Sequence, residues 1–516
     1  MLVSEPQYLS STGIQTGNRF AAVDLGSNSF RMEIGHLEHG GFRRIEYIKE
    51  TVRQGAGLDA DRNLTPQAMQ VGWDCLARFG ERLAGFTSSE VRAVATQTLR
   101  EARNRDDFLL RANELLGFPI NVISGREEAR LIYQGVAHML PESQERRLAI
   151  DIGGRSTELI LGQGMTPRVM ESFRVGCTTW SKRFFPDGQF SKRAFEVAEI
   201  AAMAVMDEAF EAYHPDNWDL AYGSAGTVGA IDDILQASGW YEGAITQKGL
   251  DWLQERLVAA QSVERLRIAG LREDRKNIIA GGVSILRAAF KLLGIKSLTR
   301  ALGSLRHGLI SDWLGASGSV GDQRIRSVRR LARVFQVDML HGERVEQVAT
   351  RLFSSVVGHT ETKPGGGARN EPWGCVRKLQ WAAQLHEIGR HIAHSDYHRH
   401  GAYILENSDS IGFSLPEMHH LSLLVMGHRG RLRKVESAFG DDGLVLQLMA
   451  LRLAVIVCHA RCDPDLEGMT FQRAGPQVLR LAFRPGWAAA YPQSAHLLRE
   501  EVAEWQKTNW RLELNI

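Results

Sequence analysis

The chain has 516 residues, of which 44% are hydrophobic and 24% are charged, and its formal net charge is +2. This composition is that of a soluble globular protein and excludes a disordered, low-complexity chain, and the length predicts two to four domains. Five cysteines without a CxxC spacing argue against a disulfide framework and predict a reducing, cytoplasmic environment.

A strand, an acid and a Gly/Ser-rich turn occur twice, after a polar segment at residues 1–18 that is expected to be disordered. Residues 22–35 read AVDLGSNSFRMEIG, and residues 149–162 read AIDIGGRSTELILG, which places Asp24 and Asp151 127 residues apart. Such a turn points N–H groups and hydroxyls at an anion. Two copies predict two related half-domains that face each other across a phosphate-binding cleft.

The same succession of elements follows each copy, judged from apolar periodicity and turn signals. After the first copy we expect strands in FRRIEYIKETVRQ, VRAVAT and INVIS, and helices near residues 66–83, from Thr98 and from Gly125. After the second copy we expect strands in RVMESFRVG and DLAYGS, and helices at residues 195–213 and from Thr227. A duplication of this size predicts an α/β fold rather than a solenoid.

The duplicated region ends near Leu314, where GASGSVGDQ has the composition of a flexible linker. Helical periodicity dominates beyond it, interrupted by a Gly/Pro-rich loop at residues 361–372. The apolar stretch at residues 444–460 is shorter than the roughly 20 residues of a membrane span and is predicted to be a buried helix. The predicted domains are a tail at 1–18, α/β domains at 19–138 and 139–314, a helical domain at 324–478 and a small unit at 479–516.

Several long segments carry a family resemblance. AVDLGSNSFRMEI, AVATQTLREARN, VISGREEARLIYQGV, AIDIGGRSTELI and AYGSAGT occur in this order, followed by LQWAAQLHEIGRHIAHSDYHRHGAYILENSD. Together they resemble the exopolyphosphatase/guanosine-pentaphosphate phosphatase (Ppx/GppA) family. The resemblance implies duplicated RNase H-like domains of the actin/Hsp70/sugar-kinase superfamily with the active site between them. It also implies a C-terminal helical domain related to HD phosphohydrolases, and a homodimer.

Glu127 and Glu128 open the helix that is expected from Gly125. Two acids in a first turn are most simply explained by the helix dipole. In the family, however, the second Glu of this motif is the proposed catalytic base. The resemblance therefore assigns to Glu128 the task of orienting and deprotonating a water for in-line attack on a terminal phosphoryl group.

Acids and donors of the two loops form the rest of the predicted site. Asp24 and Asp151 fit simple turn capping, but their shared repeat position favours metal and phosphate chemistry. With Glu158, which lines the site in the family, they are expected to hold Mg²⁺ or Mn²⁺. The predicted phosphate-binding residues come from the two loops, the TQTLREARN segment and the GSAGT turn: Ser27, Asn28, Ser29, Arg31, Arg100, Gly153, Gly154, Arg155, Ser156, Thr157, Gly223, Ser224 and Gly226.

Arg155 departs from the family pattern, which usually has a third glycine at this position. If the position requires a positive φ, an arginine costs on the order of 1 kcal/mol. The equivalent residue of the first loop is Asn28, which argues for tolerance. Two outcomes stay open: Arg155 either adds a phosphate clamp or crowds the site and slows turnover.

The helical region carries two further patterns. Ten histidines fall within residues 341–428, which invites a metal-site interpretation. An HD hydrolase needs adjacent His and Asp, whereas this chain has His386 and Glu387, whose longer side chain is expected to misplace its oxygen. The resemblance implies a degenerate site without metal chemistry. Arginines offer another role, a guide for a long polyanion bound electrostatically: Arg324, Arg329, Arg330, Arg429 and Arg433.

The resulting prediction is a cytoplasmic, Mg²⁺-dependent exopolyphosphatase that releases orthophosphate from polyphosphate ends. The same cleft serves the sister activity on guanosine pentaphosphate (pppGpp), and the sequence does not separate the two. A polyphosphate or alarmone sensor with little turnover is supported only by Arg155. A kinase of the same superfamily is disfavoured because Glu128 activates water. No nucleic-acid partner and no transmembrane segment are expected.

Overall fold

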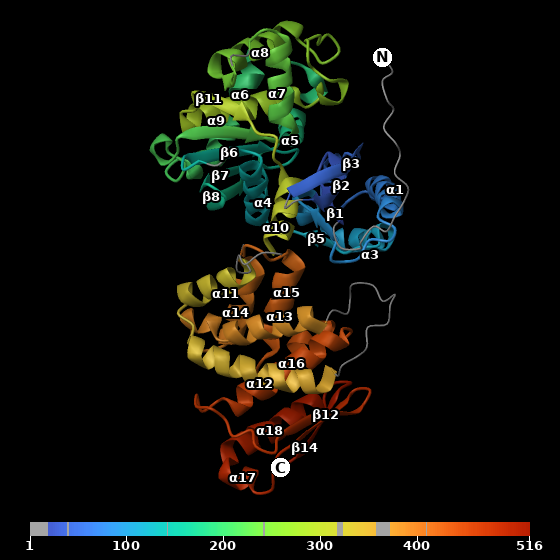
Figure 1. Ribbon diagram of the computed structural model, residues 1–516, viewed down its shortest axis with the longest axis vertical. Helices are drawn as coiled ribbons and strands as arrows, with labels where there is room; N and C mark the ends of the chain where they lie inside the picture. Colours follow the sequence, from blue (N-terminus) through green and yellow to red (C-terminus); the bar gives the residue numbers. More distant parts are fainter. Residues whose placement is uncertain are drawn as a thin grey trace, which may run out of the picture. The chain divides into compact units, whose positions relative to one another are not determined.

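The chain divides by its packing into two compact units (Figure 1). The computed structural model describes residues 19–38, 41–141, 143–240, 243–316, 323–357, 372–408 and 410–516. The double-sheet unit comprises Met1–Ile120 and Ala129–Leu314, and the helical unit comprises Asn121–Glu128 and Gly315–Ile516. The tail predicted at residues 1–18 lies outside the described residues, as do most of the predicted linker and most of the Gly/Pro-rich loop.

The first repeat is a five-stranded sheet in the order β3-β2-β1-β4-β5. β1 runs antiparallel to β2 and parallel to β4. The strands are β1 (Arg19–Leu25), β2 (Ser29–Glu38), β3 (Gly41–Thr51), β4 (Val91–Ala95) and β5 (Ile120–Val122). The helices are α1 (Pro66–Arg82), α2 (Gln97–Glu101), α3 (Arg105–Leu116) and α4 (Gly125–His138).

The second repeat is a six-stranded sheet in the order β10-β11-β9-β6-β7-β8. Its strands are β6 (Arg146–Ile152), β7 (Thr157–Gln163), β8 (Thr166–Phe173), β9 (Leu220–Ser224), β10 (Ile245–Thr246) and β11 (Ser297–Arg300). Its helices are α5 (Cys177–Phe184), α6 (Lys192–Met206), α7 (Ala225–Ala237), α8 (Gln247–Ala260), α9 (Ile279–Leu293) and α10 (Leu305–Ala316). The order β8-β7-β6-β9 repeats β3-β2-β1-β4, so the duplicated α/β fold predicted from the sequence is confirmed.

The central strands place the loops at one edge of each sheet. β1 and β6 are buried almost throughout, as expected for strands covered on both faces. In register, Leu25 pairs with Ala95 and Asp151 pairs with Ser224, each across a parallel ladder. Because parallel strands end at the same edge, the turns after β1 and β4 lie together, and so do the turns after β6 and β9.

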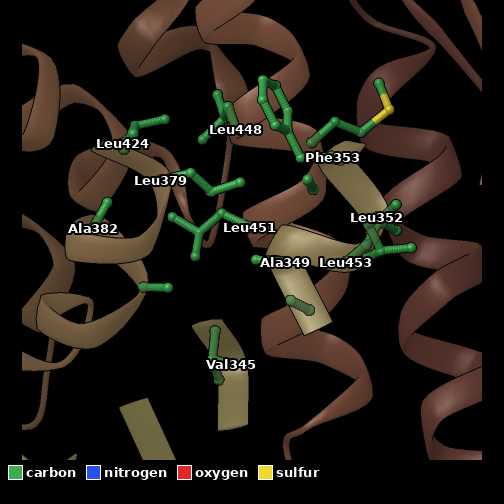
Figure 2. Packing of buried hydrophobic residues seen from close by; sticks show 14 of the residues in the cluster. Val345, Ala349, Leu352, Phe353, Leu379, Ala382, Leu424, Leu448, Leu451 and Leu453 are labelled. Atoms are coloured by element: carbon green, nitrogen blue, oxygen red, sulfur yellow. The ribbon is translucent and has the colours of Figure 1, made fainter. Parts of the chain in front are cut away.

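The helical unit is built around one apolar core. Its helices are α11 (Gln323–Val334), α12 (Met339–Val357), α13 (Pro372–Leu385), α14 (Tyr397–Asn407), α15 (Leu415–Gly427), α16 (Asp442–Val457), α17 (Trp487–Ala490) and α18 (Pro492–Trp505). Its strands β12 (Thr470–Gly475), β13 (Val478–Ala482) and β14 (Arg511–Asn515) form a sheet in that order. Figure 2 shows Val345, Ala349 and Phe353, at helical spacing on α12, beside residues of α13, α15 and α16.

The apolar stretch at residues 444–460 forms most of α16, and nearly all of its side chains up to Val457 are buried. The buried helix predicted there is confirmed. Among the described residues, no helix has the length and apolarity needed to cross a membrane.

Candidate active site

The two phosphate loops share one backbone geometry. A Cβ placed on Gly26 would lie 3.1 Å from the carbonyl oxygen of Ser29, and one placed on Gly153 would lie 3.2 Å from that of Ser156. Gly153 N–H donates to the Ser156 carbonyl over 2.9 Å. Each turn is thus tight enough to favour glycine at its first position, which explains why glycine recurs there.

Asp24, at the end of β1, lies among cations. It pairs in register with Arg31 of β2, and its carboxylate is 3.7 Å from the Arg31 guanidinium and 3.6 Å from that of Arg306 on α10. Burial raises the pKa of the Asp24 carboxyl, and the two arginines offset this only in part. The first loop is therefore a cationic setting in which the acid is already neutralised.

Asp151, at the same position of β6, faces an acid instead. It pairs in register with Glu158 of β7, which is fully buried and accepts a hydrogen bond from Ser172 Oγ over 2.8 Å. Cross-strand partners project from the same face of a sheet, and two carboxylates are the donors that Mg²⁺ prefers. Asp151 and Glu158 fit a divalent cation. Asp24 fits less well because its cross-strand partner is an arginine and not a second carboxylate.

Buried donors gather around these loops. Among the buried side-chain donors of the double-sheet unit that make no hydrogen bond within the described structure are Ser29 Oγ, Arg31 Nε, Arg155 Nε and Arg306 Nη1. Buried donors are nearly always satisfied, so each of these needs an explanation. Three are guanidinium nitrogens, and an anion that enters the loops would supply their acceptors.

Arg155 joins the two repeats. Its guanidinium donates to the Gly55 carbonyl over 2.9 Å and forms an ion pair with Glu101 of α2. Burial would raise the pKa of Glu101, but hydrogen bonds from Arg155 and Gln97 outweigh it and lower that pKa. Arg155 has no positive φ, so the strain considered from the sequence is not present. The side chain lies where the two loops approach each other, since a Cβ on Gly55 would lie 2.9 Å from Arg155 Cδ and 3.0 Å from Ser27 Cβ.

α2 completes this network. Gln97 donates to Glu101 over 2.6 Å, and Arg100 donates to Gln97 over 2.6 Å. Thr98 Oγ1 donates to Ser27 Oγ over 2.8 Å. The segment TQTLREARN is therefore in contact with both phosphate loops, as its predicted role requires.

Two hydroxyl groups that were predicted to bind phosphate donate their hydrogen bonds to backbone carbonyls of the protein instead. Ser224 Oγ donates to the Gly303 carbonyl over 2.8 Å, and Thr157 Oγ1 donates to the Val175 carbonyl over 2.6 Å. At these two positions a phosphate would have to be bound by backbone N–H groups.

Sequence reasoning missed two arginines of the double-sheet unit. Arg306 contacts Asp24 and, over 3.3 Å, Glu33. Arg275 approaches the GSAGT turn so closely that a Cβ on Gly226 would lie 2.2 Å from its Nη2. Both are buried. No local pattern marked them, since Arg275 lies in a run of charged residues and a single arginine in a mostly apolar stretch, as at Arg306, does not reveal its partner.

The segment that carries Glu128 packs with the helical unit. Residues 121–128 are assigned to that unit, and Ile123 forms an antiparallel bridge with Ser414. The Glu127 carboxylate accepts the Gly412 N–H over 2.8 Å. Glu128 is 8% exposed, in the first turn of α4. Its role as base stays a prediction.

The predicted polyanion-guide arginines differ in their surroundings. Arg329, Arg330, Arg429 and Arg433 are exposed. Arg324 forms an ion pair with Glu417 over 3.3 Å and covers the Trp381 ring. Arg329 also lines a cavity of about 240 Å³ together with Glu343 and Glu346, so its surroundings are not purely basic.

Comparison with known proteins decides the family. The model of the Ppx/GppA phosphatase family matches residues 34–317, and that of Ppx/GppA phosphatase domain III matches residues 323–502. The chain belongs to the Ppx/GppA phosphatase family. It is therefore a hydrolase of phosphoanhydride bonds, and the resemblance drawn from the sequence is confirmed.

Several relatives extend over nearly the whole chain. The guanosine-5'-triphosphate,3'-diphosphate pyrophosphatase of Vibrio cholerae is 37% identical over 96% of this chain and 98% of its own length. That of Vibrio parahaemolyticus is 38% identical over 96% and 97%. The crystal structure of an exopolyphosphatase from Cytophaga hutchinsonii matches 58% of this chain and 98% of its own with a TM-score of 0.53. At 24% identity, that likeness shows the fold alone.

Proposed function

We propose that this chain hydrolyses the terminal phosphoanhydride bond in the 5′-triphosphate group of pppGpp. The supporting observation is the 37–38% identity, over 96% of the chain, to relatives named for this substrate. Water adds to the terminal phosphorus, the bridging P–O bond breaks, and orthophosphate and the 3′-diphosphate, 5′-diphosphate nucleotide leave. Exopolyphosphatase activity, the main prediction from the sequence, becomes the second candidate, and sensing without turnover the third.

The residues of the chain divide the work by charge. Ser29, Arg31 and Arg306 offer the terminal phosphate buried donors, and Arg155 offers one from the opposite loop. Asp151 and Glu158 would hold Mg²⁺, or Mn²⁺, which when bound neutralises charge on the phosphate oxygens. Glu128 would take the proton of the attacking water. Preorganised donors of this kind stabilise charge that grows in the transition state.

The deciding experiment measures Mg²⁺-dependent phosphate release from pppGpp and from long-chain polyphosphate in parallel. We expect faster release from pppGpp, and a loss of at least about 1000-fold in Glu128→Gln, since this variant removes the base. Faster phosphate release from polyphosphate would support exopolyphosphatase as the main activity instead. Tight pppGpp binding without release would support the sensor.

The guide arginines are tested in the same assay. If they serve polyphosphate alone, neutralising Arg329, Arg330 and Arg433 weakens long-chain binding and leaves pppGpp hydrolysis unchanged. Equal loss on both substrates would contradict a guide. A homodimer and a cytoplasmic location also stay proposals, and gel filtration with light scattering tests the first.

A further inference from the structure

Four buried histidines of the helical unit lie ring beside ring. His341 is on α12, His386 follows α13, His398 is on α14 and His428 follows α15, and each is at most 7% exposed. The ring centroids of His341 and His386 are 5.4 Å apart, those of His386 and His428 are 5.3 Å apart, and those of His398 and His428 are 6.3 Å apart. The proposed function uses none of these side chains.

Hydrogen bonds fix which ring nitrogen carries the proton. Nδ1 of His386 is 2.7 Å from the Ala383 carbonyl oxygen, and Nδ1 of His428 is 2.6 Å from that of Val425. A carbonyl oxygen only accepts, so each Nδ1 donates and each Nε2 keeps its lone pair. Both Nε2 atoms, and Nδ1 of His341, are buried without a hydrogen-bond partner in the described part of the chain.

This arrangement is typical of histidines that bind metal ions. A ligating imidazole almost always donates its other N–H to a carbonyl or carboxylate, which sets the tautomer and the ring orientation. A buried acceptor that receives no hydrogen bond is otherwise costly. Two such acceptors, with the unpartnered Nδ1 of His341 in the ring next to His386, therefore point to a missing electrophile.

Glu387 adds an oxygen to the same place. One ligand atom each from His341, His386 and Glu387 lies within 4.8 Å of the other two. The ligand atoms of a tetrahedral ion with bonds of about 2.0–2.1 Å stand roughly 3.3–3.4 Å apart, so binding requires these side chains to move inward. The structure places a Glu387 oxygen near both rings, although its longer side chain was expected to misplace it. Both carboxylate oxygens also accept from Arg461 over 2.6 Å, and one of them accepts from Arg390 over 2.6 Å, so a bound ion would share the carboxylate with two guanidinium groups.

We propose that His341, His386 and Glu387 bind one transition-metal ion of the zinc class, and that His428 Nε2 becomes the fourth ligand by moving toward them, since it is not among the atoms that lie within 4.8 Å of one another. Two or three imidazole nitrogens with one carboxylate oxygen favour Zn²⁺ and its neighbours over Mg²⁺ or Ca²⁺, which take oxygen ligands. The ion would join α12, α13 and the loop after α15.

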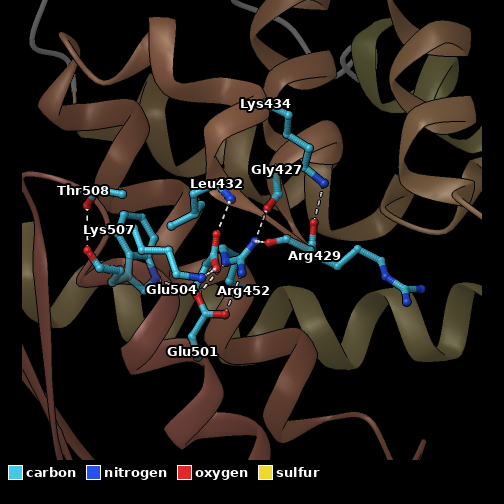
Figure 3. Close-up of polar contacts among 11 residues, drawn as sticks. Gly427, Arg429, Leu432, Lys434, Arg452, Glu501, Glu504, Lys507 and Thr508 are labelled. Atoms are coloured by element: carbon cyan, nitrogen blue, oxygen red, sulfur yellow. Dashed lines mark hydrogen bonds and ion pairs between the residues drawn. The ribbon is translucent and has the colours of Figure 1, made fainter.

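The loop that carries His428 is rigidly held. Arg452 donates to the Gly427 carbonyl over 2.6 Å and to the Gly430 carbonyl over 3.0 Å, on either side of His428. Figure 3 shows this guanidinium between the loop and Glu501, to which it donates over 2.5 and 2.7 Å. A ligand on such a loop is preorganised, so little order has to be gained on metal binding.

The test uses the full chain after chelator treatment, with Mg²⁺ in excess so that oxygen-donor sites are occupied. Co²⁺ is titrated while its visible absorption is recorded, and Zn²⁺ stoichiometry and thermal stability are measured separately. We expect one ion per chain, a visible spectrum of a tetrahedral nitrogen–oxygen site, and a higher Tm with Zn²⁺. His341→Gln and His386→Gln should each weaken binding at least about 100-fold.

His419→Gln is the matched control, because His419 is exposed and pairs with Glu406 on the surface of the same unit. It should bind as the wild type does. If His386→Gln does not fold, His341→Gln decides. The proposal is overturned if the wild type binds no ion, if both variants bind as tightly as the control, or if binding is lost in Cys462→Ser, since exposed Cys462 would then be the ligand.

Discussion

The contact between Arg155 and Glu101 allows the two roles considered for Arg155 to be separated. The guanidinium reaches from the second phosphate loop to α2 of the first repeat, and the two side chains are only 18% and 13% exposed. A charge-assisted hydrogen bond at such burial contributes about 1.5–3 kcal/mol. We expect Arg155→Ser to lower the stability of the double-sheet unit by about 2 kcal/mol, because Glu101 keeps only Gln97 as a partner.

A double-mutant cycle with Glu101→Gln isolates the contact. Thermal unfolding of wild type, both single variants and the double variant should give a coupling of about 1–2 kcal/mol. Effects that add within about 0.5 kcal/mol would refute the interaction.

Steady-state kinetics on the same four proteins then show whether Arg155 binds the substrate phosphate or obstructs the site. If Arg155 binds substrate phosphate, Arg155→Ser raises KM about tenfold, the equivalent of one hydrogen bond, whereas Glu101→Gln releases the guanidinium and does not raise KM. An equal rise in both variants would mean that Arg155 only joins the repeats. A lower KM with higher kcat in Arg155→Ser would mean that it crowds the site.

Three further changes test the helical unit. Glu127→Ala should lower kcat about 10–100-fold because it loses the contact with the Gly412 N–H. Glu127→Gln still accepts that N–H and should stay active, and steady-state kinetics on the two variants test this. Arg452→Ala should cost about 3–5 kcal/mol in thermal unfolding because the Glu501 carboxylate stays buried; a loss below 1 kcal/mol would contradict a buried pair. Burial and neighbouring arginines lower the pKa of Lys434 to about 7, so protonating it costs stability as the pH falls toward 7. Tm measured against pH should show Lys434→Met most stabilising at or below pH 7, with the gain vanishing near pH ~10.

The duplicated fold could be predicted because its signal is local. A strand, an acid at its end and a glycine turn occupy fourteen contiguous residues, twice, and the close approach of Gly26 to the Ser29 carbonyl recurs at Gly153 and Ser156. This local approach favours glycine at that position in both repeats. The register of β1 with β2 and of β6 with β7 follows from the same residues.

Groups brought together only by tertiary packing could not be predicted. Arg306 reaches Asp24 from a helix more than 280 residues later, and no periodicity connects them. The histidines of the helical unit come from four separate segments, and their spacing matches no metal motif. The close packing of Gly176 on Arg155, where a Cβ would lie 2.2 Å from Arg155 N, likewise joins residues that no local pattern connects.

The most informative difference between the repeats is one of charge. At the same register position, Arg31 faces Asp24 in the first repeat and Glu158 faces Asp151 in the second. With Arg306 added, the first loop has a cationic surplus, while the second has two carboxylates. A phosphoanhydride with a bound metal ion carries the complementary charges: its terminal phosphate is anionic, and the divalent ion beside it is cationic. Under the proposed function, one duplicated loop thus became the anion side of the site and the other the cation side. Arg31→Glu should therefore weaken phosphate binding and not create a second metal site, since Arg306 still neutralises Asp24. Steady-state kinetics should show a higher KM for pppGpp, and a Mn²⁺ titration should show no additional bound ion; an additional ion would contradict this division of charge.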